Sequence, residues 1–185
     1  ASRCIRTARS RLCAMSDEFL LPAFSFRITL TRVEDRPQPA EGKWNPSVLG
    51  TTGGFAECGG LELEADVKEY LEGGRNDGVV RRVGRVKLSP IVLKRGMFAA
   101  DARANANTEL WMWLTRMVSG ELPVTRYDGR IQILNPHGQA PLATWTFERG
   151  LPQKVSGPTL NAKTGEIALE ELHIVHEGLW MELPQ

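Results

Sequence analysis

The stretch that decides the fold runs from Gly53 to Gly96 and reads GGFAECGGLELEADVKEYLEGGRNDGVVRRVGRVKLSPIVLKRG. In its first half, apolar and polar side chains alternate, and this period of two indicates a β-strand with one dry face and one wet face. The apolar set comprises Phe55, Leu61, Leu63, Ala65 and Val67, and the polar set comprises Cys58, Glu62, Glu64, Asp66 and Lys68. This pattern predicts the first arm of a long hairpin.

A glycine-rich tip and a return arm complete the predicted hairpin. The tip, residues 72–78, is rich in turn formers. In the return arm, Val86 and Leu88 alternate with Lys87 and Ser89. Both arms are longer than a typical strand of ~5–6 residues. Since a lone domain would leave the backbone edges of such a hairpin bare, we expect this protein to stack on copies of itself.

Length and composition are those of one globular domain. The chain has 185 residues, of which 42% are hydrophobic and 24% are charged. No apolar run approaches the ~20 residues that span a bilayer. We therefore expect no membrane insertion by this chain.

The first fourteen residues differ from the rest. They contain four arginines and no acidic residue, so the remaining chain has 19 basic and 22 acidic residues and a net charge of −3. This mildly acidic body gives no electrostatic case for nucleic-acid binding. We expect residues 1–14 to be a disordered or non-native extension, with a targeting segment as the alternative, and residues 15–185 to form a single domain.

Further strands follow the same alternation. It indicates strands over residues 24–31, 130–133 and 143–147, and Gly150 with Pro152 is expected to end the last of these. A long polar loop separates the first strand from the hairpin. We expect about six strands in all.

A single helix is predicted between Ala99 and Ser119. Asn105 or Asn107 can cap its start, and Gly120 can supply the left-handed residue after its end. Its apolar stripe comprises Leu110, Trp111, Leu114, Met117 and Val118, with Trp113 beside it. The fold class is therefore mainly β with one α-helix, a small barrel or sandwich with a long projecting hairpin.

The last predicted strand, 166–177, changes phase. Ile167 and Leu169 occupy odd positions, whereas Leu172 and Ile174 occupy even ones. Such a change indicates a bulge or a strand that is covered on both faces. In a self-associating protein the second cover can be another subunit, so Leu172 and Ile174 are candidates for an inter-subunit strand.

The sequence contains none of the common catalytic motifs for phosphate binding, dinucleotide binding, nucleophilic hydrolysis or zinc proteolysis. His173 and His176 lie three residues apart, and on a strand they point to opposite faces and cannot share a metal ion. Cys4 and Cys13 lie in the leader, and Cys58 has no second cysteine or histidine near it in sequence. We expect no enzymatic activity, cofactor, metal or disulfide framework.

A second interpretation belongs to another functional class. The chain could be a monomeric β-barrel module that binds a ligand between Trp44, Trp111 and Trp145. The length of the hairpin and the phase change in the last strand favour assembly over this alternative.

Several segments together resemble a known family. They are LPAFSFRITL (21–30), GGFAECGGLELEADVKEYLEGG (53–74), VKLSPIVLKRG (86–96), LWMWL (110–114) and ILNPHGQAPLATWTFERGLPQKVSGPTLNAKTGEIALEELHIVHEGL (133–179). In combination and spacing they resemble the inner tail tube protein of contractile phage tails and of phage-tail-like, extracellular contractile injection systems. The resemblance covers nearly everything from Phe19 to Leu179.

The resemblance implies an assembly and its partners. Six subunits are expected to join their sheets into a hexameric ring, and rings to stack into a tube inside a contractile sheath. The implied partners are copies of the chain itself, sheath protein, baseplate and spike proteins, and a terminator. DNA or a protein effector is the implied lumen cargo. The tube is expected to assemble in the cytoplasm and then to form part of a virion tail or an injection particle.

The resemblance also implies roles for the hairpin. Its counterpart, about Glu64 to Val86, reaches to the neighbouring ring. The candidate stacking residues are Glu69, Tyr70, Glu72, Arg75, Asp77, Arg81 and Arg82, whose mixed charges suit ion pairs that set register; the alternative is an exposed tip that touches nothing. Glu62, Glu64 and Asp66 are the candidate lumen face, and the alternative for them is an outer, solvated face.

Overall fold

A computed structural model describes residues 20–33, 48–49, 54–71, 73–74, 78–99, 106–136, 140–163 and 165–182. The elements are β1 (Phe26–Arg32), β2 (Val48–Leu49), β3 (Phe55–Gly59), β4 (Leu63–Tyr70), β5 (Val80–Leu88), β6 (Ile91–Gly96), α1 (Glu109–Val118), β7 (Tyr127–Leu134), β8 (Pro141–Ser156), β9 (Leu169–Val175) and β10 (Gly178–Glu182). All strand pairs are antiparallel. The predicted mainly β class with one helix is confirmed for the described part of the chain.

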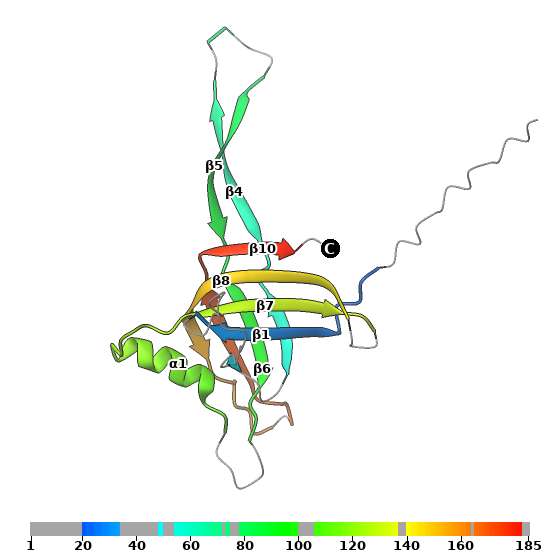
Figure 1. Cartoon of the computed structure of the whole chain (residues 1–185), viewed down its shortest axis with the longest axis vertical. Helices are drawn as coiled ribbons and strands as arrows, with labels where there is room; N and C mark the ends of the chain where they lie inside the picture. The colour runs from blue at the N-terminus through cyan, green and yellow to red at the C-terminus, as the bar shows by residue number, and fades with distance from the viewer. Residues whose placement is uncertain are drawn as a thin grey trace, which may run out of the picture.

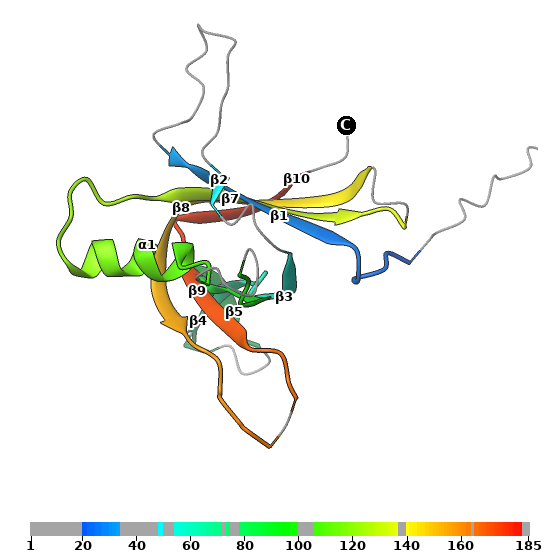
Figure 2. The same cartoon turned by 90° about the horizontal axis from the view of Figure 1, so that it is seen from below.

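The strands form two layers that share β8. Hydrogen-bonded neighbours follow the order β2-β1-β7-β8-β9-β6-β3. β10 lies off this path and pairs with the first part of β8. One layer therefore contains β2, β1, β7, β8 and β10, and the other contains β8, β9, β6 and β3. Figure 2 shows the two layers with α1 beside them. Because β2 and β3 end the path and do not pair with each other, the described strands form an open sandwich and not a closed barrel.

A bend within β8 creates the two layers. Arg149 has a φ of 53°, and its N–H donates to Asp128 Oδ1 at 2.9 Å. A Cβ on Gly150 would lie 2.8 Å from both Phe147 and Ile174, so only glycine fits this corner. The sequence prediction that the strand ends at Gly150 and Pro152 is therefore wrong: the strand turns there and continues to Ser156.

The core lies between the layers. Ile28 and Leu30 of β1 face inward and alternate with polar residues, as predicted for the first strand. The buried cluster comprises Leu30, Ile91, Leu93, Leu110, Trp113, Ile131, Phe147, Leu172, Ile174 and Leu179. Full burial of such side chains stabilises a fold by about 1.5–3 kcal/mol each.

Helix α1 closes one end of the core but is shorter than predicted. Asn107 Oδ1 accepts the N–H of Glu109 at 3.0 Å, and Gly120 has the expected positive φ. Trp113 is the buried centre of the apolar stripe, and its Nε1 donates to the carbonyl of Thr125 at 2.9 Å. Trp111 and Val118, which the periodicity placed in the stripe, are exposed.

The long hairpin is confirmed and consists of two parts. At its base, β3 pairs with β6 inside the body. Beyond Gly60, β4 and β5 form a separate two-stranded ribbon, which projects far from the sandwich (Figure 1). Gly60 has a φ of +80°, and a Cβ there would lie 2.1 Å from the carbonyl oxygen of Pro90. Glycine is therefore required at the point where the ribbon leaves the body.

An ion pair inside the fold connects three elements. Arg95 Nε on β6 donates to Glu170 Oε1 on β9, and the two side chains are 1% and 0% exposed. Arg95 Nη2 also donates to Asn107 Oδ1, at 3.1 Å, next to the start of α1. The pair therefore ties the sheet to the helix. No sequence pattern predicted it.

We predict that removing one charge of this pair destabilises the protein strongly. Glu170→Gln leaves Arg95 as an uncompensated buried charge, so the free energy of unfolding should fall by about 3–5 kcal/mol. Urea denaturation of dilute protein, followed by circular dichroism, measures this change.

Two further variants make the stability test specific. The apolar double variant Arg95→Met/Glu170→Leu should recover most of the lost stability, because no buried charge remains. Glu57→Gln removes the partner of Lys94 at the surface and should cost far less stability than Glu170→Gln, because solvent screens an exposed ion pair. Equal losses for Glu57→Gln and Glu170→Gln would contradict the prediction.

Candidate assembly surfaces

The described residues contain no group of three or more histidine, cysteine, aspartate or glutamate side chains that could hold a metal ion. His173 Nε2 lies 2.5 Å from Glu171 Oε1, and this hydrogen bond holds the pKa of Glu171 below its ordinary value. His176 Nε2 lies instead 3.2 Å from the carbonyl oxygen of Ser89. Burial raises the pKa of the Cys58 thiol to about 11, which keeps it protonated at neutral pH and makes it a poor nucleophile.

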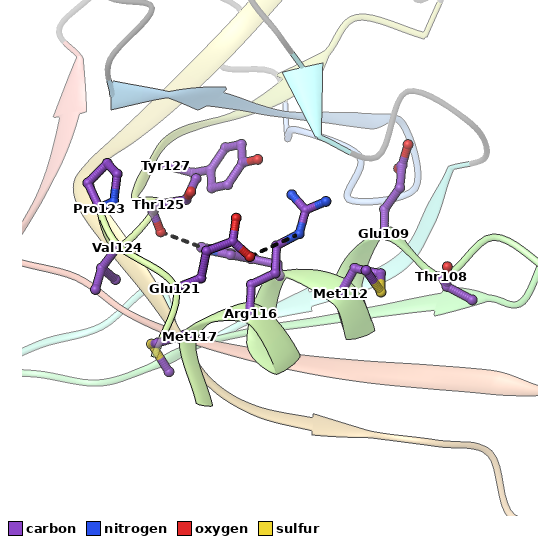
Figure 3. A pocket seen from close by; sticks show the side chains of 11 residues that line it. Thr108, Glu109, Met112, Arg116, Met117, Glu121, Pro123, Val124, Thr125 and Tyr127 are labelled. Atoms are coloured by element: carbon purple, nitrogen blue, oxygen red, sulfur yellow. Dashed lines mark hydrogen bonds and ion pairs between the residues drawn. The ribbon is translucent and has the colours of Figure 1, made fainter. Parts of the chain in front are cut away.

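A small hollow lies between α1 and the segment that follows it (Figure 3). Trp113 and Tyr127 meet edge to face in its wall, and Arg116 pairs with Glu121 at 3.7 Å. Neither Trp111 nor Trp145 lines it, and Trp44 lies outside the described residues. The two described tryptophans of the ligand-binding alternative therefore do not line this hollow, and we do not favour that alternative.

The outer part of the ribbon contains the described stacking candidates. Glu69 and Arg81 are directly opposite each other and form an exposed ion pair at 3.0 Å. Arg82 lies over the ring of Tyr70, 5.2 Å from its centroid. Three further candidates, Glu72, Arg75 and Asp77, lie outside the described residues. Glu69, Arg81 and Arg82 thus already have partners within the hairpin.

The candidate lumen residues lie at the base of the ribbon and along its part next to the body, residues 63–67 and 83–88, which we call the stem. Glu62 Oε2 accepts from Ser89 Oγ at 3.4 Å. Lys87 lies 2.7 Å from Asp66 and 3.9 Å from Glu64, and these neighbours raise the pKa of the lysine. The ladder puts Glu64 opposite Lys87, so this is the polar face of the stem.

The candidate inter-subunit strand lies inside the fold. Leu172 and Ile174 are 0% exposed, and β9 pairs with β6 on one edge and with β8 on the other. The even positions of this strand face the core, whereas Leu169 is exposed and Ile167 lies before the strand and is exposed as well. β9 therefore has no free edge for another subunit, which corrects the expectation from the phase change.

Sequence reasoning missed a large polar sheet face. The ladders align four strands, β1, β7, β8 and β10, in rows across the layer. Its outward side chains include Arg27, Thr29 and Thr31 on β1, Asp128, Arg130 and Gln132 on β7, Thr146 and Glu148 on β8, and Glu182 on β10. They line a shallow hollow, and Arg130 pairs with Glu182 at 3.3 Å. The alternation of threonines with apolar residues in β1 and β8 was the available signal.

Within the described part of the chain, this layer also has unpaired edges. β10 pairs only with β8 among the described strands. On the far side, β2 pairs with β1 only at Leu30 and Thr31, so the part of β1 from Phe26 to Thr29 has one described neighbour, β7. Unpaired strand edges invite another strand. Among the described strands, the outer edge of β10 and the Phe26–Thr29 part of β1 are therefore unpaired.

No helix among the described residues has the length and apolarity needed to cross a membrane. A search of the curated proteins found no match.

Solved structures of contractile injection systems share this fold. A chain of the PVC sheath–tube complex in the extended state, from an extracellular contractile injection system, aligns with a TM-score of 0.66 and 22% identity, covering 90% of this chain and 93% of that one. A chain of the PVC sheath/tube terminator gives 0.69 and 22%, covering 91% and 100%. A chain of the anti-feeding prophage baseplate gives 0.67 and 17%, covering 89% and 97%.

A family profile covers most of the sequence. The profile of the T4-like virus tail tube protein gp19 matches residues 22–180 of the 185. The match includes every element from β1 to β9 and most of β10. The chain therefore belongs to the T4-like virus tail tube protein gp19 family.

Proposed function

We propose that this chain is the structural subunit of an inner tube, and that six copies form a ring around a central channel. The observation that carries the proposal is the four-stranded layer with a polar outer face and two open edges. Joining such edges in a closed ring removes exposed backbone groups. The number six follows the family resemblance and agrees with the 6-fold symmetry named for the anti-feeding prophage baseplate.

The strand directions permit this ring. The four strands β1, β7, β8 and β10 alternate in direction because each pair is antiparallel. A second copy placed with β1 beside the outer edge of β10 therefore continues the alternation, with the same face inward. Repetition of one head-to-tail contact closes a ring when the rotation allows it.

We assign the channel lining to the polar face of this layer. The face carries threonines, a glutamine and charges of both signs, so water solvates it and cargo can slide past without an extended apolar contact. Glu62, Glu64 and Asp66, the lumen residues expected from sequence, lie on the ribbon and at its base outside this layer. We therefore propose the sheet face in their place.

The outer ribbon suits contacts between rings. We propose that Glu69, Tyr70, Arg81 and Arg82, together with the tip at residues 72–78, contact the next ring. Charged groups at such a contact set register and orientation more than affinity. An open stacking face lets rings grow into a tube.

The proposed partners follow from this role. Sheath protein surrounds the tube, baseplate and spike proteins lie at one end, and a terminator lies at the other. DNA or a protein effector is the cargo of the channel. The subunit assembles in the cytoplasm and later forms part of a virion tail or an extracellular injection particle; it catalyses no reaction.

The formation of rings and their stacking can be tested directly. Purified protein should give a species of six times 20.5 kDa in native mass spectrometry, and rings or tubes in negative-stain electron microscopy. Replacement of residues 72–78 by Asn-Gly closes the hairpin with a two-residue turn and should leave rings that no longer stack. Tubes of normal length from this variant would contradict the role of the tip, and a persistent monomer would contradict the ring.

The channel lining can be tested by labelling. In a chain with its three cysteines replaced by serine, Thr146→Cys should bind an organomercurial whose density lies on the channel wall in averaged end-on images. Met112→Cys, on the exposed side of α1, is the matched control and should place the label outside the wall. Mercury density outside the wall for Thr146→Cys would overturn the assignment.

A further inference from the structure

We propose that the lower part of the ribbon is a lateral contact between subunits, and that it packs against the copy that completes the edge of β10. The contact surface is an apolar stripe of four side chains, Leu63, Val67, Val83 and Val86, which we call the stem stripe. This proposal rests on the proposed ring and names the surface that its neighbouring copy covers.

The stem stripe is exposed in the isolated subunit. Leu63, Val67, Val83 and Val86 are 60%, 59%, 77% and 62% exposed. They lie on one face, because Val67 is directly opposite Val83 and Ala65 is directly opposite Val86. An isolated two-stranded hairpin is marginally stable in water, and a contiguous apolar patch on its surface marks an interaction site.

A bulge keeps the stripe on one face. Between Ala65 and Val67 the first arm advances by two residues, while the second arm advances by three, from Val86 to Val83. The extra residue shifts the apolar positions of β5 from even to odd numbers. Gly84 lies at this point, where a Cβ would lie 3.1 Å from the carbonyl oxygen of Asp66. The bulge thus aligns valines that simple alternation would place on opposite faces.

The opposite face of the stem already has partners within the ribbon. Lys87 lies between Asp66 and Glu64, and Arg82 lies on Tyr70. These charges are exposed and matched, so water and the hairpin satisfy them. The side chains of the stem stripe have no such partners in the described structure. Covering this face with another molecule lowers the free energy, because it removes apolar surface from water.

The position of the ribbon identifies that molecule as a second copy. All four side chains of the stem stripe are more than half exposed in the described structure, so the described body of the same chain does not cover the stripe. The ribbon projects toward the side of the molecule on which β10 ends the layer (Figure 1). A copy that pairs with the open edge of β10 is therefore brought next to the stem. The same neighbouring copy would therefore both extend the ring and bury the stem stripe.

The ribbon then has two zones with different tasks. The stem is apolar on its contact face, whereas beyond it the same face carries the Glu69–Arg81 ion pair. Apolar burial supplies the affinity of a contact, and charges supply its orientation. We infer that the stem holds neighbours within a ring and that the outer zone orients one ring on the next.

The double variant Val67→Thr/Val83→Thr tests the stem stripe. Threonine keeps the β-branched shape and the strand preference, and both sites are exposed, so circular dichroism of the monomer should not change. The concentration for half-maximal ring formation, measured by analytical ultracentrifugation, should rise about tenfold or more. Hydrogen exchange at residues 63–67 should also slow on ring formation in the unaltered protein.

Val80→Thr is the matched control, because Val80 lies opposite Tyr70 on the other face of the ribbon. It should leave ring formation unchanged. Equal ring formation by the double variant and the unaltered protein would overturn the lateral contact and leave the proposed tube function standing. Equal loss in both variants would show that the ribbon acts through its stability and would also overturn it. Absence of rings from the unaltered protein would overturn both proposals.

Discussion

The bend of β8 is the constraint on which the rest of the structure depends. One strand of sixteen residues pairs with β7 and β10 before the bend and with β9 after it. Arg149 in the left-handed region and Gly150 under Phe147 allow the chain to turn without leaving the ladder. Without this corner, the layer that ends at β10 and the layer that carries the hairpin would be one flat sheet, and no core would form between them.

The two layers have different surfaces. The layer of β1, β7, β8 and β10 has a dry inner face and a polar outer face, and among the described strands part of each outer edge is unpaired. The other layer extends into the ribbon through β3 and β6. The buried pair of Arg95 and Glu170 lies at the junction of this layer with α1. The same fold thus combines a buried ion pair at its centre with unpaired described strand edges at its margins.

Much of the fold could be predicted from local periodicity. The hairpin, the first strand and the single helix all follow from apolar spacing, because the dry face of each element must be buried. The phase change at Leu172 and Ile174 has a local origin, because these two residues face the core while Ile167 lies before β9 and is exposed together with Leu169. Sequence alone does not show that both edges of β9 are paired within the same chain. The polar sheet face and the buried ion pair unite residues up to 155 positions apart, and no local pattern relates them.

The sequence by itself determined the class of the fold, the presence of a projecting hairpin and the family, since alternation, turn residues and motif spacing are local properties. Only the tertiary structure decided which edges remain open, which faces are wet and which valines share one side of the ribbon. The physical reason is that strand neighbours and register depend on contacts between distant segments, and a single bulge or bend reassigns every side chain beyond it.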